Sequence, residues 1–282
     1  MKRLLPYTIN VKGQLIDLSE PQVMGILNVT PDSFFSGSRK QTETEIRERV
    51  AEIFNEGASM IDVGAYSSRP DADDISPEEE MSRLRRGLKI VREMYPEAVV
   101  SVDTFRADVA RMCVEEYGAD IINDISGGNM DCRMFSTVAE LGIPYILMHM
   151  KGTPQTMQQS PQYDDLMKDI LLYFAERVQQ LRDLGQKDII IDPGFGFAKT
   201  LNHNYELMQQ LDKLGIFKLP ILVGISRKSM IYRLLGGTPA DALNGTTTLN
   251  TIALLKGVSI LRVHDVKECV EVVNIVKKMK EF

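Results

Sequence analysis

The sequence of 282 residues predicts an α/β fold, a (β/α)8 TIM barrel with a short N-terminal β-hairpin, in a single domain over residues 1–282. Short apolar runs, each followed by a polar turn and a helical pattern, recur eight times along the chain. The runs are almost continuously apolar, as in parallel strands whose two faces are both covered. Eight such alternating units favour a barrel over a doubly wound sheet.

The expected elements follow one another in a regular order. A hairpin is expected at residues 7–19, with its turn at Lys12–Gly13, and it should cover one end of the barrel. Strands are expected at residues 23–29, 60–64, 98–103, 120–124, 144–150, 188–192, 220–226 and 259–265. Helices are expected at residues 44–55, from 77 onward, and at 106–117, 131–141, 166–181, 201–214, 229–257 (one short, one longer) and 266–276.

The second helix has the clearest start signal in the sequence. Ser76 is expected at the N-cap, Pro77 at the first helical position, and Glu79 at the capping-box position.

Composition excludes several classes of protein. Hydrophobic residues make up 44% and charged residues 26% of the chain, which is ordinary for a globular protein. The net charge of -6 argues against non-specific nucleic-acid binding. No run of about 18 apolar residues predicts a membrane span, and the apolar part of the N-terminus is too short for a signal peptide. Three scattered cysteines, Cys113, Cys132 and Cys269, indicate a reduced cytoplasmic protein.

Candidate functional residues lie where the predicted strands end, because barrels of this kind carry function at the carboxyl ends of their strands. These positions hold carboxylates, amides and cations that are expected to converge on one pocket. They are Asn28, Ser67, Ser68, Arg69, Asp103, Asn123, Met148, His149, Asp192, Ser226, Arg227, Lys228, Arg262 and His264. A G-x-G-x-x-G motif does not follow the first strand, which weakens a dinucleotide-binding alternative.

The residue types indicate the kind of ligand. Two carboxylates and an amide, Asp103, Asp192 and Asn123, match a flat heterocycle with an edge of N–H donors. Lys228 can donate to a ring carbonyl or ring nitrogen.

A second group of residue types suits an anion. Arg69, Arg262 and His264 can bind phosphate oxygens. Asn28 offers a neutral oxygen to Mg²⁺, which usually keeps several waters and binds through substrate phosphates. Together the candidates indicate a nitrogenous heterocycle attached to a phosphate or pyrophosphate.

Simpler roles compete for the acidic and amide candidates. Asp103 precedes Thr104 and could cap a helix, and Asp192 precedes a Pro-Gly turn. Asn123 and Asp124 are neighbours on one strand and should point to opposite faces, with Asn123 expected to face the barrel interior.

Simpler roles compete for the cationic candidates as well. Lys228 could be solvated or could form a Schiff base, as in some barrel aldolases. Arg262 and His264 share one strand face, so without a bound anion they would need a nearby carboxylate. His149 and His203 are expected to be structural or surface residues.

Eight motifs follow one another over nearly the whole chain. They are LNVTPDSFFSG (27–37), DVGAYSSRP (62–70), SVDTF (101–105), INDISGG (122–128), LMHMKGTPQTMQ (147–158), DPGFGFAKT (192–200), GISRKS (224–229) and RVHD (262–265). In this order they resemble the dihydropteroate synthase family. The resemblance implies a homodimeric barrel enzyme of folate biosynthesis, a sulfonamide target, which joins 6-hydroxymethyl-7,8-dihydropterin pyrophosphate to 4-aminobenzoate with release of pyrophosphate.

The resemblance also implies site roles. The pterin-binding set would be Asp103, Asn123, Asp192 and Lys228, lined by Met148, Phe197 and Gly224. The pyrophosphate and Mg²⁺ set would be Asn28, Arg262 and His264. The aminobenzoate set would be Ser68, Arg69, Pro70, Ser226 and Lys228, and the loops at about 30–40 and 65–75 would be lids.

One loop departs from the family pattern. Tyr66 stands where Glu is common in the family, and Ser68 stands where Thr is common and keeps the hydroxyl group. This departure is the only feature that favours a non-catalytic pterin-binding paralogue. Two other hypotheses are a methyltetrahydrofolate-binding methyltransferase barrel, which could share the pterin-facing Asp and Asn, and a lyase that uses Lys228. The motifs assigned to pyrophosphate count against the methyltransferase.

Overall fold

The computed structural model describes residues 7–30, 43–67, 74–153, 157 and 161–281. Eight parallel strands form one sheet in the order β8-β7-β6-β5-β4-β3-β10-β9, and a bridge between Ile191 and Ile221 joins its two edges into a barrel. The strands are β3 (Gln22–Asn28), β4 (Met60–Gly64), β5 (Val99–Asp103), β6 (Ile121–Asp124), β7 (Tyr145–Met148), β8 (Ile189–Asp192), β9 (Leu222–Val223) and β10 (Ile260–Val263). The predicted barrel is confirmed.

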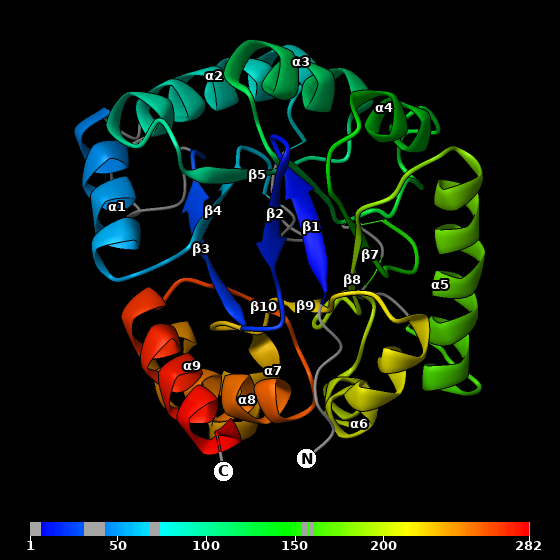
Figure 1. Ribbon diagram of the computed structural model, residues 1–282. Coiled ribbons are helices and arrows are strands. Elements are labelled where there is room, and N and C mark those ends of the chain that lie inside the picture. Colours follow the sequence, from blue (N-terminus) through cyan, green and yellow to red (C-terminus); the bar gives the residue numbers. More distant parts are fainter. Residues whose placement is uncertain (1–6, 31–42, 68–73, 154–156, 158–160, 282) are drawn as a thin grey trace.

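Helices form an outer ring around the strands (Figure 1). They are α1 (Glu43–Asn55), α2 (Pro77–Met94), α3 (Ala107–Tyr117), α4 (Met134–Leu141), α5 (Leu166–Asp183), α6 (Leu201–Gln210), α7 (Ser229–Leu235), α8 (Leu243–Leu255) and α9 (Val266–Lys280), with 3₁₀ turns η1 (Leu211–Phe217) and η2 (Pro239–Ala242). Among the described residues, no helix is long and apolar enough to cross a membrane.

The N-terminal hairpin, β1 (Thr8–Val11) and β2 (Gln14–Asp17), lies across one opening of the barrel (Figure 1). Its turn residues, Lys12 and Gly13, both have positive φ, 50° and 81°, as a two-residue turn of type I′ requires. Three buried hairpin residues pack on the apolar side chains that fill this end of the barrel. The cluster contains Ile9, Val11, Leu18, Met24, Met60, Ile121, Ile146, Ile190, Leu222 and Ile260. The hairpin is therefore the predicted cover.

Local signals explain where α2 begins. The Ser76 side chain accepts a hydrogen bond from the backbone N–H of Glu79 at 3.2 Å, and Pro77 occupies the first helical position, as predicted.

Most predicted elements are observed with their ends shifted by up to four residues, and two differ further. The strand expected at residues 220–226 has only two strand residues, because the chain turns after Gly224, where Arg227 has φ 56° and the Lys228 N–H donates to the carbonyl of Ile225. The helix expected at residues 201–214 is α-helical only to Gln210 and then tightens into η1.

Candidate active site

Polar side chains appear in the barrel one step above the apolar cluster that contacts the hairpin. Side chains two residues apart on a strand share a face, so each strand brings the residue two positions after its cluster member into the interior. Ile121, Ile190 and Ile260 belong to the apolar cluster. The residues two positions later are Asn123, Asp192 and Arg262. The period of the strands therefore delivers these predicted site residues to one end of the barrel.

Strand register aligns three of the predicted residues. Asn28 pairs with Gly64, Gly64 with Asp103, and Asp103 with Asn123 across β3 to β6. A Cβ atom at Gly64 would lie 3.5 Å from Oδ1 of Asn28 and 3.4 Å from Cβ of Asp103. The glycine thus leaves room for Asn28 and Asp103 to face each other across β4.

Arg262 is the centre of a partly buried ionic network. Its Nε donates to Oδ2 of Asp62 at 2.6 Å, and its Nη2 donates to Oδ2 of Asp103 at 2.8 Å. Nδ2 of Asn123 donates to the same Oδ2 of Asp62 at 3.1 Å. Arg262 therefore pairs with nearby carboxylates, as the sequence analysis expected of it in the absence of a bound anion. Two carboxylates compensate the charge of the partly buried guanidinium.

Asp62 is a site residue that the sequence analysis did not select. It is fully buried, and its Oδ1 has no hydrogen-bond partner among the described residues. It precedes the end of β4 by two residues and therefore lies below the strand-end positions that were considered. The available signal was an aspartate within the apolar run MIDVG, on the strand face shared by Met60 and Gly64.

Asp103 and Asp192 are carboxylates in a low-polarity setting. Burial raises the pKa of Asp103, opposed by the charge of Arg262, and burial also raises the pKa of Asp192, opposed chiefly by Lys228. Oδ1 of Asp192 accepts the N–H of Gly194 at 2.8 Å, so one oxygen has the turn role considered above. Asp103 is not a helix cap, because α3 has Arg106 at its N-cap position.

The side chain of Lys228 lies against two phenylalanines of the loop after β8. Its Nζ donates to the carbonyl of Phe195 at 2.5 Å and lies 4.6 Å from the ring centre of Phe197. Burial lowers the pKa of Lys228 to about 8, while Asp192 opposes that shift. The ammonium is therefore partly desolvated, and a proton can leave it near neutral pH.

An apolar cluster borders these charges. Met148 and Phe197, both predicted to line a slot, belong to it, and Tyr66 packs edge-on against Phe105 with 5.0 Å between ring centres. The other members are Ile125, Met130, Met150, Met157 and Ala198. A Cβ atom at Gly224 would lie 3.9 Å from Arg262, so this glycine leaves the guanidinium stem uncovered. The wall suits the faces of a flat ring.

His264 and Ser226 form the other polar pair. Nδ1 of His264 lies 3.1 Å from Oγ of Ser226, and the His264 N–H donates to the same oxygen at 3.2 Å. Burial, helped by Arg262, lowers the pKa of His264 to about 4. At neutral pH, Arg262 and His264 are therefore one cation and one neutral imidazole, which reduces the cost of placing them on one face.

The remaining predictions have mixed outcomes. Asp124 points away from Asn123, because its carboxylate accepts from Tyr145 Oη and from the N–H groups of Ser126 and Gly128; the predicted inward position of Asn123 is confirmed. His203 caps α6. Ser68, Arg69 and Pro70, with most of both expected lids, lie outside the described residues.

A cation site made only of protein side chains is not found in the described part of the chain, where His, Cys, Asp and Glu form no group of three that could hold a metal. The half-exposed Asn28 nevertheless offers Oδ1 at a strand end, next to Asp103. One or two protein oxygens are enough for Mg²⁺ when waters and substrate phosphates complete its octahedron. The residues present fit such an ion.

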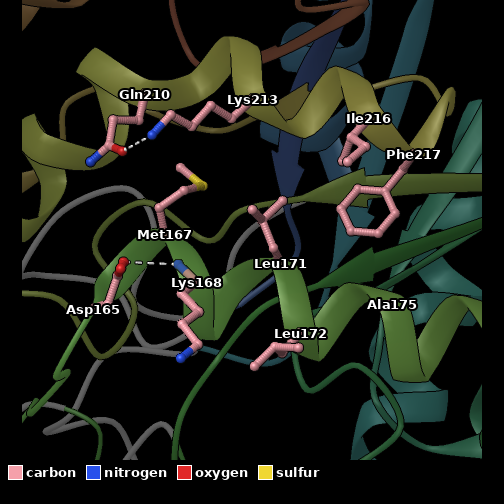
Figure 2. A pocket seen from close by; sticks show the side chains of 10 residues that line it. All are labelled: Asp165, Met167, Lys168, Leu171, Leu172, Ala175, Gln210, Lys213, Ile216 and Phe217. Carbon is pink, nitrogen blue, oxygen red and sulfur yellow. Dashed lines mark hydrogen bonds between the residues drawn. The ribbon is translucent and has the colours of Figure 1, made fainter.

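A groove of about 570 Å³ lies elsewhere, on the outside of the barrel between α5 and the α6–η1 segment (Figure 2). Leu171 of α5 faces Ile216 and Phe217 across it. It is lined by Asp165, Met167, Lys168, Leu171, Leu172, Ala175, Gln210, Lys213, Ile216 and Phe217. Because no strand-end residue lines it, the candidate site remains at the barrel mouth.

Comparison with known proteins first defines a class. The family model described as "Pterin binding enzyme" matches residues 24–264, which contain the barrel strands apart from the first two residues of β3. The chain therefore belongs to the pterin-binding enzymes.

Individual relatives define the family more closely. The chain is 42% identical over 268 residues to the dihydropteroate synthase of Escherichia coli, covering 94% of each chain. It is 40% identical to the Yersinia pestis dihydropteroate synthase solved with a sulfonamide drug, with a TM-score of 0.92 over 98% of this chain and 100% of that one. The Xanthomonas albilineans enzyme with 4-aminobenzoic acid gives 32% identity and a TM-score of 0.90, over 99% and 100%. Within its class, this chain is a member of the dihydropteroate synthase family.

Proposed function

We propose that the chain condenses 6-hydroxymethyl-7,8-dihydropterin pyrophosphate with 4-aminobenzoate, giving 7,8-dihydropteroate and pyrophosphate in folate biosynthesis. The observation that carries the proposal is the joint placement of half-buried Asp103 and buried Asn123 and Asp192 beside Lys228 and Arg262 at one barrel mouth. Relatives with nearly complete coverage bear the synthase name, and solved members hold 4-aminobenzoic acid or a sulfonamide drug.

The pterin ring is proposed to lie between the apolar wall and Arg262. Its N–H edge would donate to the carboxylates of Asp103 and Asp192 and to the side-chain oxygen of Asn123, since ionised carboxylates are acceptors only. Lys228 would donate to a ring acceptor, and Met148 and Phe197 would cover one face of the ring. Gly224 leaves the space that the ring needs next to Arg262.

The pyrophosphate is proposed to bind near Arg262 and His264. The guanidinium supplies a fixed positive charge, and the imidazole, neutral at pH 7, supplies an N–H donor. Mg²⁺, held by Asn28 and by phosphate oxygens, would supply further positive charge to the leaving group. Binding of phosphate would require Arg262 to share its Nη2 donor, which now contacts Asp103.

The reaction is proposed to begin with cleavage of the bond between the pterin methylene carbon and the pyrophosphate oxygen. The bonding pair leaves with pyrophosphate, and the charge that develops there is stabilised by Arg262 and His264. The cationic pterin methylene is stabilised by its ring, whose N–H edge faces two carboxylates. The aminobenzoate nitrogen then attacks the methylene carbon and loses a proton.

The second substrate is proposed to bind near Ser68, Arg69, Pro70, Ser226 and Lys228. Ser226 is buried and hydrogen-bonded to His264, so the two substrates would meet at a connected set of polar groups. Closure of the loops at residues 30–40 and 65–75 would exclude water from the cationic methylene. We also propose a single-domain, cytoplasmic protein that works as a homodimer.

The decisive test is product formation by the purified chain. With both substrates and Mg²⁺, the chain should form 7,8-dihydropteroate and pyrophosphate in equal amounts, measured by chromatography and by a pyrophosphate assay. Omission of Mg²⁺ should lower the rate, and omission of 4-aminobenzoate should abolish dihydropteroate. Pterin binding without any product would instead support the non-catalytic alternative, and transfer of a methyl group would support the methyltransferase.

A further inference from the structure

A second lysine, fully buried, lies behind the apolar residues that border the site. Lys199, in the loop between β8 and α6, is 3% exposed. Its Nζ contacts Nδ1 of His149 at 3.1 Å, the carbonyl of Gly194 at 3.0 Å and the carbonyl of Phe197 at 3.1 Å. An ammonium group has three N–H bonds, and three uncharged acceptors surround this one.

The surroundings make this lysine costly to keep. Burial lowers the pKa of Lys199 to about 7, with Asp192 opposing the shift and Lys228 adding to it. Burial likewise lowers the pKa of His149 well below its ordinary value, so the ring is neutral and can accept at Nδ1. A methionine of similar length would fill the cavity without that desolvation cost. What Lys199 adds to the structure, compared with a methionine, is therefore its three hydrogen bonds to these acceptors.

The acceptors belong to the two segments that form the apolar wall. His149 directly follows Met148, at the end of β7, whereas Gly194 and Phe197 belong to the loop after β8. A Cβ atom at Gly194 would lie 2.1 Å from the carbonyl oxygen of His149, so the two segments touch through their backbones. Lys199 links the two segments through its hydrogen bonds to His149 in one and to Gly194 and Phe197 in the other.

The loop after β8 has a backbone that needs such support. Gly194 and Gly196 have φ of 70° and 82°, and Ala198, which is not a glycine, has φ 48°. A left-handed alanine costs about 1–2 kcal/mol and persists only where its surroundings hold it. Lys199 binds the carbonyls of Gly194 and Phe197, and Lys228 binds the carbonyl of Phe195 between them.

We propose that Lys199 is a positioning residue for the pterin slot. By binding both ends of the 194–197 segment and the imidazole of His149, it sets the ring of Phe197 and the carbonyl of Phe195 that directs Lys228. Lys199 touches no substrate in this proposal and acts through Phe197 and Lys228. The inference rests on the proposed function, because it assigns the slot to the pterin.

The test is the Lys199→Met variant, which keeps the volume and removes the donors. The dissociation constant for 6-hydroxymethyl-7,8-dihydropterin, measured by calorimetry, should rise at least tenfold. The inhibition constant of pyrophosphate should change less than twofold, because Arg262 and His264 lie outside the 194–197 segment. Lys213→Met, at an exposed lysine of η1, is the matched control and should leave both constants unchanged.

Specific outcomes would overturn the inference. They are an unchanged pterin dissociation constant in folded Lys199→Met, or an equal weakening of pterin and pyrophosphate, which would indicate a general structural role. If Lys199→Met does not fold, His149→Leu tests the same contact from the other side, with an expected threefold to tenfold weakening for pterin alone. Unchanged binding there contradicts the inference. Failure of the unaltered chain to form dihydropteroate would contradict the proposed function instead.

Discussion

Two layers inside the same barrel have opposite chemistry, although one strand step separates them. The layer that contacts the hairpin is apolar, with members such as Ile190 and Ile260 that are fully buried. The layer two residues later contains Asp192 and Arg262, and Asp192 is only 6% exposed. The strand backbone is thus the same in both layers, and most of the side chains are buried in both, although Arg262 is only half-buried. The main difference is the chemistry of the side chains.

The difference shows how stability and function are divided along each strand. Burying an aliphatic side chain contributes about 1.5–3 kcal/mol, whereas burying a charge costs free energy unless partners compensate it. The raised pKa of Asp192 and the lowered pKa of Lys228 reflect that cost. The apolar layer and its hairpin cover therefore stabilise a barrel whose other end holds the candidate site.

The largest expected effect is on activity, in the upper layer. Asp192→Asn keeps an oxygen that can accept the N–H of Gly194 but removes the charge that we propose faces the pterin edge. We expect kcat/KM to fall about 10³-fold, or about 4 kcal/mol, with stability changed by less than about 1 kcal/mol. Steady-state kinetics and urea unfolding measure both. A fall smaller than tenfold would remove Asp192 from the site.

The matching change one step lower should affect stability alone. Ile190→Ala leaves a cavity in the cluster beneath the hairpin, and such truncations cost about 2–5 kcal/mol. Urea denaturation should show this loss, while kcat/KM well below the unfolding temperature should stay within about threefold. If Ile190→Ala lowered kcat/KM as much as Asp192→Asn does, the apolar layer would contribute to activity as well as to stability, which would contradict the proposed division.

The Asp62→Asn variant tests whether the polar layer, which contains Arg262, depends on the carboxylate that pairs with that arginine. Asp62→Asn removes the charged partner of Arg262 Nε, so the guanidinium should be less well oriented. We expect KM for the pterin pyrophosphate to rise about 30-fold, equivalent to about 2 kcal/mol. Ser101→Ala, at the paired position on β5, is the control and should be nearly neutral because its buried Oγ has no partner among the described residues. An unchanged or lower KM in Asp62→Asn would contradict the role.

The smallest effect is a pH dependence of stability. Burial lowers the pKa of Lys228 to about 8 in the folded chain, whereas the unfolded chain has the ordinary lysine value of about 10.4. Between these values the unfolded state binds more protons, so the free energy of unfolding should rise with pH. Lys228→Met should reduce that rise by roughly 1–2 kcal/mol between pH 8 and pH 10, measured by urea denaturation. Lys213→Met should leave the rise unchanged. If Lys228→Met shows the same rise in the free energy of unfolding as the unaltered chain, Lys228 is not the group that causes it.

Most of the fold could be predicted because its signals are local. Apolar runs, glycine stops and the Ser76 cap predict most elements to within a few residues of their observed bounds, and β4 begins and ends where predicted. β9 is the exception, since the length of a strand depends on where its neighbours stop pairing. An apolar run such as PILVGIS cannot reveal that point.

The site was predicted only in part, for a related reason. Strand-end position identifies Asp103, Asn123, Asp192 and Arg262, because parallel strands all end at the same edge. Asp62 escaped because it lies within a strand and matters only through Arg262, which is 200 residues away in the chain.

The sequence by itself determined the eight strand–helix units and the types of group at the barrel mouth, because period and composition are local properties. The tertiary structure alone decided which groups meet. It paired Arg262 with Asp62 and Asp103, made His264 a neutral partner of Ser226, and surrounded Lys199 with three uncharged acceptors. Register and burial make those choices, and both depend on residues far apart in the chain.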